Sequence, residues 1–131
     1  MIKPVLTTLL LALSLSSCHE SLEKRAEREA REFTEKNCPT PPQNDAITDS
    51  LVFDVATRTH KTYLTFTGQI DNPEAIKEHE DDIRTELLNT IRQNTSMKAY
   101  KDAGFNFEYI CRSEKEGKIV LHLRYSEKDY K

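Results

Sequence analysis

Two stretches in which apolar and polar residues alternate constrain the fold of this 131-residue chain more than any other feature. Each stretch is interrupted once by a turn, at 57–61 in the first and at 113–118 in the second. The apolar positions are Leu51, Phe53, Val55, Leu64 and Phe66, and then Phe105, Phe107, Tyr109, Ile119, Leu121, Leu123 and Tyr125. A period of two places alternate side chains on one face of a strand, so each stretch predicts a β-hairpin.

Two further segments have the pattern of helices. Residues 20–36 lack Gly and Pro and carry a thin apolar stripe, and the proline-rich residues 39–46 that follow predict an extended connector. Residues 73–95 have apolar positions at helical spacing. Asn72 is suited to cap this helix, and Pro73 suits its first position.

The predicted order of elements is α-β-β-α-β-β, which is typical of an α+β fold. We expect an antiparallel four-stranded sheet made of the two hairpins, with helices on one face. The length of the chain suits one domain with a modest core.

The N-terminus has the layout of a secretory signal peptide. Lys3 provides a basic start, and an apolar run of about a dozen residues follows, too short to span a bilayer as a helix. The run ends at Leu15-Ser16-Ser17-Cys18, which resembles the lipobox of bacterial lipoproteins.

This resemblance implies that residues 1–17 are removed and that acyl chains are attached to Cys18, which would anchor the protein stably. It also favours the outer membrane, because His19 stands where some lipoproteins carry an Asp that retains them in the inner membrane. The competing interpretation is an ordinary signal peptide with Cys18 near the cleavage site by chance.

The predicted organisation is a lipoprotein signal peptide at 1–17, a lipid-anchored charged helix at 18–37 and a small α+β domain at 38–131. The order of elements resembles that of PepSY-like and β-lactamase-inhibitor-like envelope proteins. The chain is also similar in its overall plan to small lipoproteins of the bacterial envelope.

The chain contains three cysteines, so lipidation of Cys18 leaves Cys38 and Cys111. In an oxidising compartment we expect these two to form a disulfide, and closure of a loop of about 70 residues would stabilise the fold by roughly 4 kcal/mol. The alternative is a pair of buried free thiols.

The densest cluster of candidate ligands is Glu78-His79-Glu80-Asp81-Asp82. His79-Glu80 begins like the zinc-protease motif HExxH, but Ile83 stands where the second His is required. A solvated helix face also accounts for this cluster. No serine has a G-x-S-x-G setting, so we expect no catalytic residue, metal or cofactor.

A row of polar strand residues is the remaining candidate site. Tyr63, Thr65 and Thr67 share one face of a predicted strand, and His122 and Arg124 share the outer face of another. If helices cover one face of the sheet, this row faces solvent and is available to a partner. Outward threonines also occur merely because they form strands well.

These features favour a lipid-anchored, non-catalytic binding or adaptor module of the cell envelope, whose partners are the membrane and an envelope protein. The formal net charge of −3 argues against nucleic acid. Two alternatives remain open: a small envelope hydrolase or metal-dependent enzyme that uses His79 and Glu80, and an enzyme inhibitor.

Overall fold

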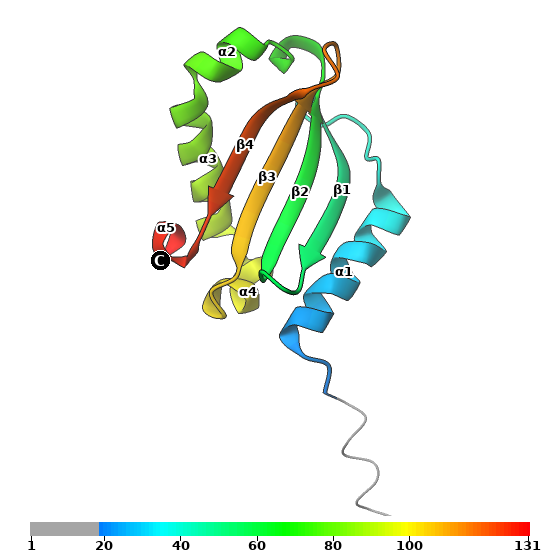
Figure 1. Cartoon of the computed structure of the whole chain (residues 1–131), viewed down its shortest axis with the longest axis vertical. Helices are drawn as coiled ribbons and strands as arrows, with labels where there is room; N and C mark the ends of the chain where they lie inside the picture. The colour runs from blue at the N-terminus through cyan, green and yellow to red at the C-terminus, as the bar shows by residue number, and fades with distance from the viewer. Residues whose placement is uncertain (1–18) are drawn as a thin grey trace, which may run out of the picture.

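The computed structural model describes residues 19–131, so the predicted lipobox and Cys18 lie outside the described residues. Within these residues, five α-helices and four strands make up the fold, together with two short 3-10 helices at Gly68–Ile70 and Thr95–Met97 (Figure 1). The α-helices and strands are α1 (Leu22–Asn37), β1 (Ala46–Asp54), β2 (Thr59–Phe66), α2 (Pro73–Glu78), α3 (Glu80–Gln93), α4 (Lys98–Asp102), β3 (Asn106–Ser113), β4 (Ile119–Tyr125) and α5 (Glu127–Tyr130).

The four strands form one mixed sheet in the order β1-β2-β3-β4. Both predicted hairpins are present as antiparallel pairs, but β2 and β3 are parallel, so the prediction of a wholly antiparallel sheet is wrong. The cause lies in the connection between the hairpins. After β2 ends, the chain returns along the length of the sheet through α2 and α3, and β3 therefore starts beside the start of β2, with Asn106 opposite Thr59 (Figure 1).

The helix predicted at 73–95 forms over most of this range but is divided at His79. Its start is as expected, since Asn72 Oδ1 accepts a hydrogen bond from the Ala75 N–H at 3.2 Å and Pro73 takes the first position. His79 has φ −105° and ψ 17°, which ends α2 and turns the chain into α3.

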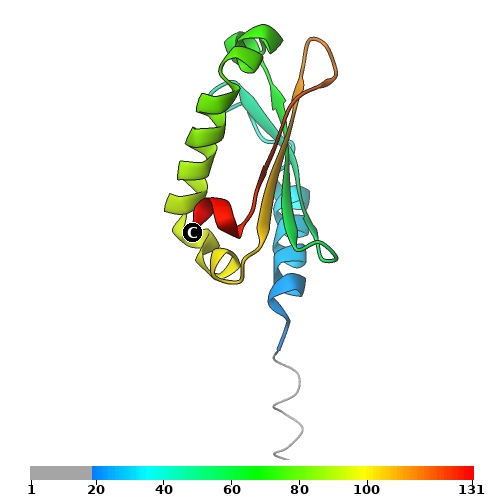
Figure 2. The ribbon, with the colours of Figure 1, turned by 60° about the vertical axis from the view of Figure 1, so that its left-hand side comes forward.

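The core lies between the sheet and the helices α2 to α5, which all lie on the same side of it (Figure 2). An aromatic cluster occupies its centre. The ring of His60 lies 4.9 Å from those of Phe53 and Tyr100 and 5.7 Å from that of Phe107, measured between centroids. At the C-terminus, Tyr130 closes the core by donating a hydrogen bond from its hydroxyl to the Phe105 carbonyl at 2.8 Å.

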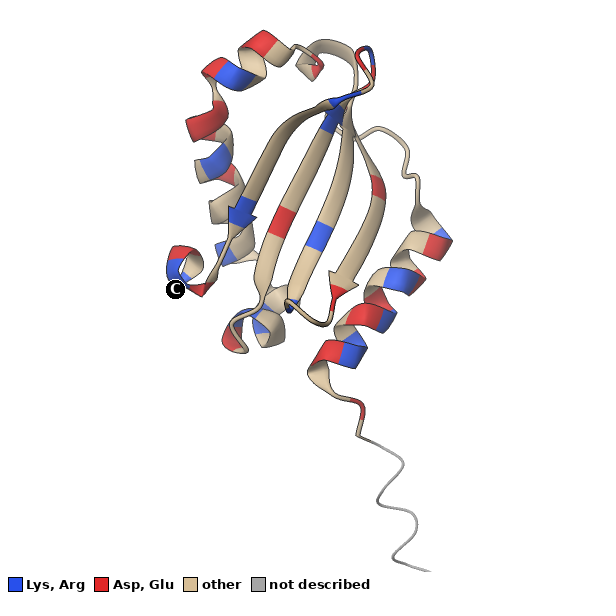
Figure 3. Cartoon of the chain, in the orientation of Figure 1, with Lys and Arg blue, Asp and Glu red and all other residues tan. Residues whose placement is uncertain are grey.

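Helix α1 runs along β1, at the edge of the sheet (Figure 1). Ser21 caps its start by accepting a hydrogen bond from the Lys24 N–H at 3.1 Å. Ala26 and Ala30 are buried, and their small side chains allow the helix to approach the strand closely. The helix thus belongs to the domain, although its outward face is densely charged (Figure 3).

Cys38 and Cys111 are both free thiols in the structure, which does not support the predicted disulfide. Cys111 lies in β3, two strand spacings or about 10 Å from β1, and Cys38 lies at the end of α1, beyond β1. A disulfide requires Cα atoms within about 7 Å. Burial raises the pKa of the Cys111 thiol to about 12, so this group stays protonated and unreactive.

Candidate binding face

The sheet presents a second face that points away from the core, here called the outer face, toward which Figure 1 looks. The strand register aligns its side chains in rows across all four strands. One row consists of Val52, Lys61, Glu108 and Arg124, and the next consists of Ser50, Tyr63, Ile110 and His122. The expectation that Tyr63 shares a face with His122 and Arg124 is therefore correct, and Thr65 lies on the same face.

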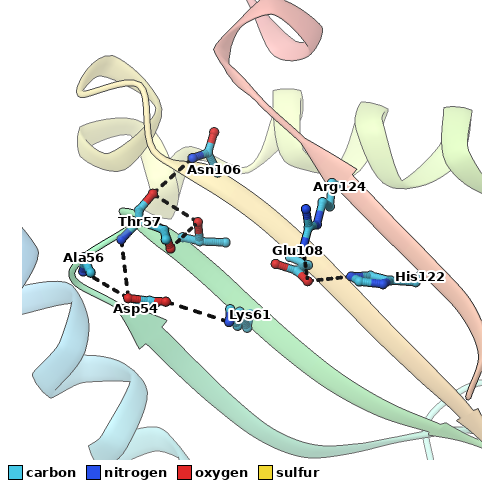
Figure 4. A network of polar contacts seen from close by, with 9 residues as sticks. Asp54, Ala56, Thr57, Lys61, Asn106, Glu108, His122 and Arg124 are labelled. Carbon is cyan, nitrogen blue, oxygen red and sulfur yellow. Dashed lines mark hydrogen bonds and ion pairs between the residues drawn. The ribbon is translucent and has the colours of Figure 1, made fainter.

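Glu108 is the centre of the charged part of this face. Its side chain is 9% exposed, Oε1 lies 2.5 Å from His122 Nε2, and Arg124 donates to the same oxygen at 3.5 Å (Figure 4). Burial raises the pKa of this carboxyl, but the hydrogen bond from His122 and the positive charge of Arg124 outweigh it. The net effect lowers the pKa, and Glu108 is a carboxylate at neutral pH.

A second carboxylate lies on the same face, at the β1–β2 turn. Asp54 accepts hydrogen bonds from the backbone N–H groups of Ala56 and Thr57, at 3.0 and 3.4 Å, and lies 3.9 Å from Lys61 Nζ (Figure 4). The backbone hydrogen bond from Thr57 is the largest cause of the lowered pKa of this carboxyl. Acidic and basic groups therefore alternate across the lower half of β2 to β4 (Figure 3).

Two shallow depressions lie on the outer face. The lower one has a volume of about 360 Å³ and includes Asp54, Lys61, Glu108 and Arg124 in its lining. The upper one has a volume of about 440 Å³, and its lining includes Tyr63, Ile110, Arg112 and Ile119. Ile119 is 62% exposed, and Val52 on the same face is 44% exposed. Charged groups beside exposed apolar ones are typical of surfaces that bind proteins.

The pair of His122 and Glu108 resembles the base and orienting acid of a hydrolase, so a nucleophile beside it would be significant. Ser50 shares the row of His122 but lies on β1, about 14 Å away across three strand spacings. Ser113 is fully buried in β3. Among residues 19–131, no hydroxyl or thiol is hydrogen-bonded to His122, so the nucleophile–base contact of a serine or cysteine hydrolase is not formed there.

The structure places the predicted ligand cluster on the exposed surface where α2 meets α3. His79 Nδ1 lies 3.6 Å from Asp82 Oδ2, and the two side chains are 64% and 86% exposed. In the part of the chain that the structure describes, no group of three or more His, Cys, Asp or Glu side chains is arranged to hold a metal ion. His79 has one acidic partner, Asp82, on this surface.

The sequence analysis misplaced one residue with a polar side chain and overlooked another. His60, expected in a turn, lies in β2 with its ring in the aromatic core, and burial lowers its pKa to about 4. Glu108 was not singled out as a site residue. Its alternation with Phe107 and Tyr109 already indicated the outer face, and the hairpin register placed it opposite Arg124.

No helix within residues 19–131 combines the length and the apolar character that crossing a membrane requires. A comparison with proteins of curated function finds no match to the chain.

Solved structures share this fold. A Pseudomonas aeruginosa protein described as secreted, PA3611, superposes with a TM-score of 0.69 at 17% identity, covering 86% of this chain and 100% of that one. The pilotin EpsS of the Vibrio vulnificus type 2 secretion system has a TM-score of 0.63 at 9% identity, covering 83% of this chain and 91% of its own. The type II secretion system pilotin AspS of Vibrio cholerae has a TM-score of 0.57 at 12% identity, covering 82% and 90%.

At these identities the structural similarity establishes the fold. A family model provides the classification, because it matches residues 21–121 and so includes α1 together with three of the strands and part of the fourth. The chain belongs to the family described as "Domain of unknown function (DUF8479)".

Proposed function

We propose that this protein is a non-catalytic adaptor of the cell envelope, attached to the outer membrane through lipid on Cys18. The adaptor binds an envelope protein through the outer face of its sheet. The observation that carries the proposal is the outer face itself. It combines the charged groups around Glu108 with the exposed apolar side chain of Ile119, and the helices of residues 19–131 pack elsewhere.

Two further observations support the proposal. Leu15-Ser16-Ser17-Cys18 resembles a lipobox, which would separate the signal peptide at 1–17 from the mature chain that begins at Cys18. Two of the structures with the same fold are pilotins of type 2 secretion systems, and these are components of a protein assembly. An adaptor role agrees with both observations, whereas an enzyme that uses His79 and Glu80 lacks support, because the His79 side chain lies on the surface and is 64% exposed.

Replacement of the anchoring cysteine tests the location. Cys18→Ser is expected to abolish incorporation of labelled palmitate and to release the protein from the outer-membrane fraction, because the acyl chains supply the membrane affinity. Cys38→Ser is the matched control and should retain both label and location. Unchanged labelling of the Cys18→Ser protein would contradict the anchor.

A photoreactive phenylalanine derivative in place of Tyr63 tests the binding face in cells. Tyr63 lies in the middle of the outer face, so irradiation is expected to produce one discrete adduct with an envelope protein. The same derivative in place of Glu86, which is exposed on α3, should give no such adduct. Adduct formation from Glu86 but not from Tyr63 would show that binding uses a different surface.

A further inference from the structure

The two edges of the sheet differ in how their backbone groups are satisfied. At the β1 edge, Thr34 Oγ1 donates a hydrogen bond to the Leu51 carbonyl at 2.9 Å and accepts one from the Leu51 N–H at 2.9 Å. The next outward residue is paired in the same way, since Thr40 N–H donates to the Thr48 carbonyl and Thr40 Oγ1 accepts from the Thr48 N–H, both at 3.0 Å. Thr34 in α1 and Thr40 just after it thus satisfy the outward backbone groups of Leu51 and Thr48 at this edge.

The β4 edge has no corresponding closure. The Ser113 N–H donates to the Lys118 carbonyl across the β3–β4 turn, whereas the Asn106 N–H donates to the Arg58 carbonyl just before β2. Because backbone N–H groups alternate in direction along a strand, the odd-numbered residues of β3 form their hydrogen bonds with β4. Their partners in β4 are the odd-numbered residues, and the backbone groups of His122 and Arg124 consequently point away from the sheet. Among residues 19–131, no hydrogen bond to these backbone groups comes from outside the ladder.

An unpaired strand edge is a template for another strand. We propose that β4 accepts an extended acidic segment of the partner protein, which pairs with it as a fifth strand. This inference rests on the proposed adaptor function and specifies how the partner is held. Backbone hydrogen bonds to His122 and Arg124 would supply affinity, as in other proteins that bind peptides by strand addition.

The charge of the β4 side chains indicates the chemistry of the segment. The outward side chains of β4 include His122 and Arg124, whereas the acidic Glu108 lies on β3, one strand further from the edge. Acidic side chains directly opposite His122 and Arg124 would be attracted, because opposite charges on paired strands stabilise the pairing. A second copy of this chain that paired through β4 would instead bring Arg124 and His122 close to their own counterparts, which is unfavourable.

The other face of the added strand would lie toward α3, which runs beside β4 on the side of its free edge (Figure 1). Ile83, Leu87 and Leu88 of α3 pack against the core but are only partly buried. Apolar side chains of an added strand would cover more of this surface. The segment is therefore expected to alternate acidic residues, on the outer face, with apolar residues, on the face toward α3.

Amide hydrogen exchange of the full chain in detergent tests this inference without knowledge of the natural partner. The probe is a capped peptide of seven residues, the length of β4, that alternates Val with Glu. At saturation it should slow exchange of the His122 and Arg124 amides at least tenfold and leave the already bonded amides of Thr48 and Leu51 unchanged. The same peptide with N-methyl groups on the amides that face β4 should have no effect.

Charge variants separate strand pairing from nonspecific attraction. Arg124→Glu should remove protection by the Glu peptide and permit protection by a peptide with Lys in place of Glu. Arg31→Glu, on the exposed surface of α1, should behave like the unmodified protein. Equal protection by both peptides would overturn the acidic preference, and unchanged exchange at His122 and Arg124 would overturn strand addition.

Self-association is the remaining outcome. If the edge amides of the unliganded protein are already protected and the protein is dimeric, β4 pairs with a second copy and the inference is wrong. The adaptor role is tested independently by the adduct from Tyr63. A specific adduct from Tyr63 together with unchanged exchange rates of the edge amides would therefore exclude the fifth strand but leave the proposed adaptor role in place.

Discussion

Neighbouring residues of the same four strands build two different rows, one on each face of the sheet. The row toward the helices contains Phe53, His60, Phe107 and Tyr125, and the row toward solvent contains Val52, Lys61, Glu108 and Arg124. Aromatic rings pack against one another in the first row, and charged groups pair in the second. Because one face accounts for most of the packing, the other can carry groups that the fold does not need.

Each row nevertheless contains a residue that departs from this division, either in polarity or in burial. His60 is a polar ring in the aromatic row, and its Nε2 is buried without a hydrogen-bond partner within residues 19–131. Glu108 is a nearly buried carboxylate in the solvent row. Substitutions of these two residues, together with one typical residue of each row, therefore test whether the two faces have different roles.

The largest effect is expected from the aromatic row. Phe107→Ala removes a ring that is 2% exposed and packs against His60 and Tyr130, so the free energy of unfolding should fall by about 3–5 kcal/mol. Urea unfolding measures this loss. Val52→Ala in the solvent row is the control, and because Val52 is 44% exposed its effect should stay near 0.5 kcal/mol or below. Equal losses would contradict the division of roles between the faces.

The second effect is the pH dependence due to His60. Burial lowers the pKa of its imidazole from 6.5 to about 4, so the unfolded chain binds more protons than the folded one between these values. Stability contributed by neutral His60 should be complete above about pH 6.5 and should be lost as the pH falls toward 4, by about 3 kcal/mol in total.

Urea unfolding at pH 7 and pH 5 measures the part of this loss that falls between these two pH values, about 2 kcal/mol. Tyr100 and the carboxylate of Glu29, which accepts a hydrogen bond from Tyr100, are the titratable groups near the ring, and Glu29 opposes the lowering of the pKa. His60→Phe should flatten the dependence, whereas His79→Gln at the exposed junction of α2 and α3 should preserve it. If the free energy of unfolding of His60→Phe still depended steeply on pH, the pH dependence would arise from other groups.

The smallest effect is expected from the solvent row. Glu108→Gln removes the charge of the carboxylate beside His122 and Arg124, and the free energy of unfolding at pH 7 should fall by about 1 kcal/mol. Because the folded-state pKa of Glu108 is lowered, the difference from wild type should be complete above about pH 4.5 and should disappear as the pH falls through the folded-state value.

Glu116→Gln in the exposed β3–β4 turn is the matched control and should change stability by less than about 0.5 kcal/mol. A loss at Glu108 as large as that at Phe107 would assign the solvent row a structural role. It would then weaken the argument that the outer face is available for binding.

Local patterns predicted the elements of this fold better than their arrangement. Alternation identified both hairpins, and Asn72-Pro73 marked the start of the helix correctly. The relative direction of β2 and β3 was missed, because alternation is the same in parallel and antiparallel strands. The direction depends on the path between them, and a helical connection as long as the sheet is typical of parallel neighbours.

The candidate site was predicted in part for similar reasons. The outward positions of Tyr63, His122 and Arg124 follow from the period of two, which also placed Glu108 among them. Its low exposure depends on neighbours from two other strands, and spacing along one strand carries no information about these. The resemblance in element order to PepSY-like and β-lactamase-inhibitor-like proteins stays a prediction.

The attachment of α1 to β1 through Thr34 has a mechanical consequence. Helix and strand run in opposite directions along the same edge, so tension on the N-terminal end of α1 acts parallel to β1 (Figure 1). In this shear geometry the contacts of Thr34, Ala26 and Ala30 share the load and do not open one after another. Forced unfolding is governed by the unfolding rate, and a domain held in this way resists a steady pull for longer than one held by its last turn alone.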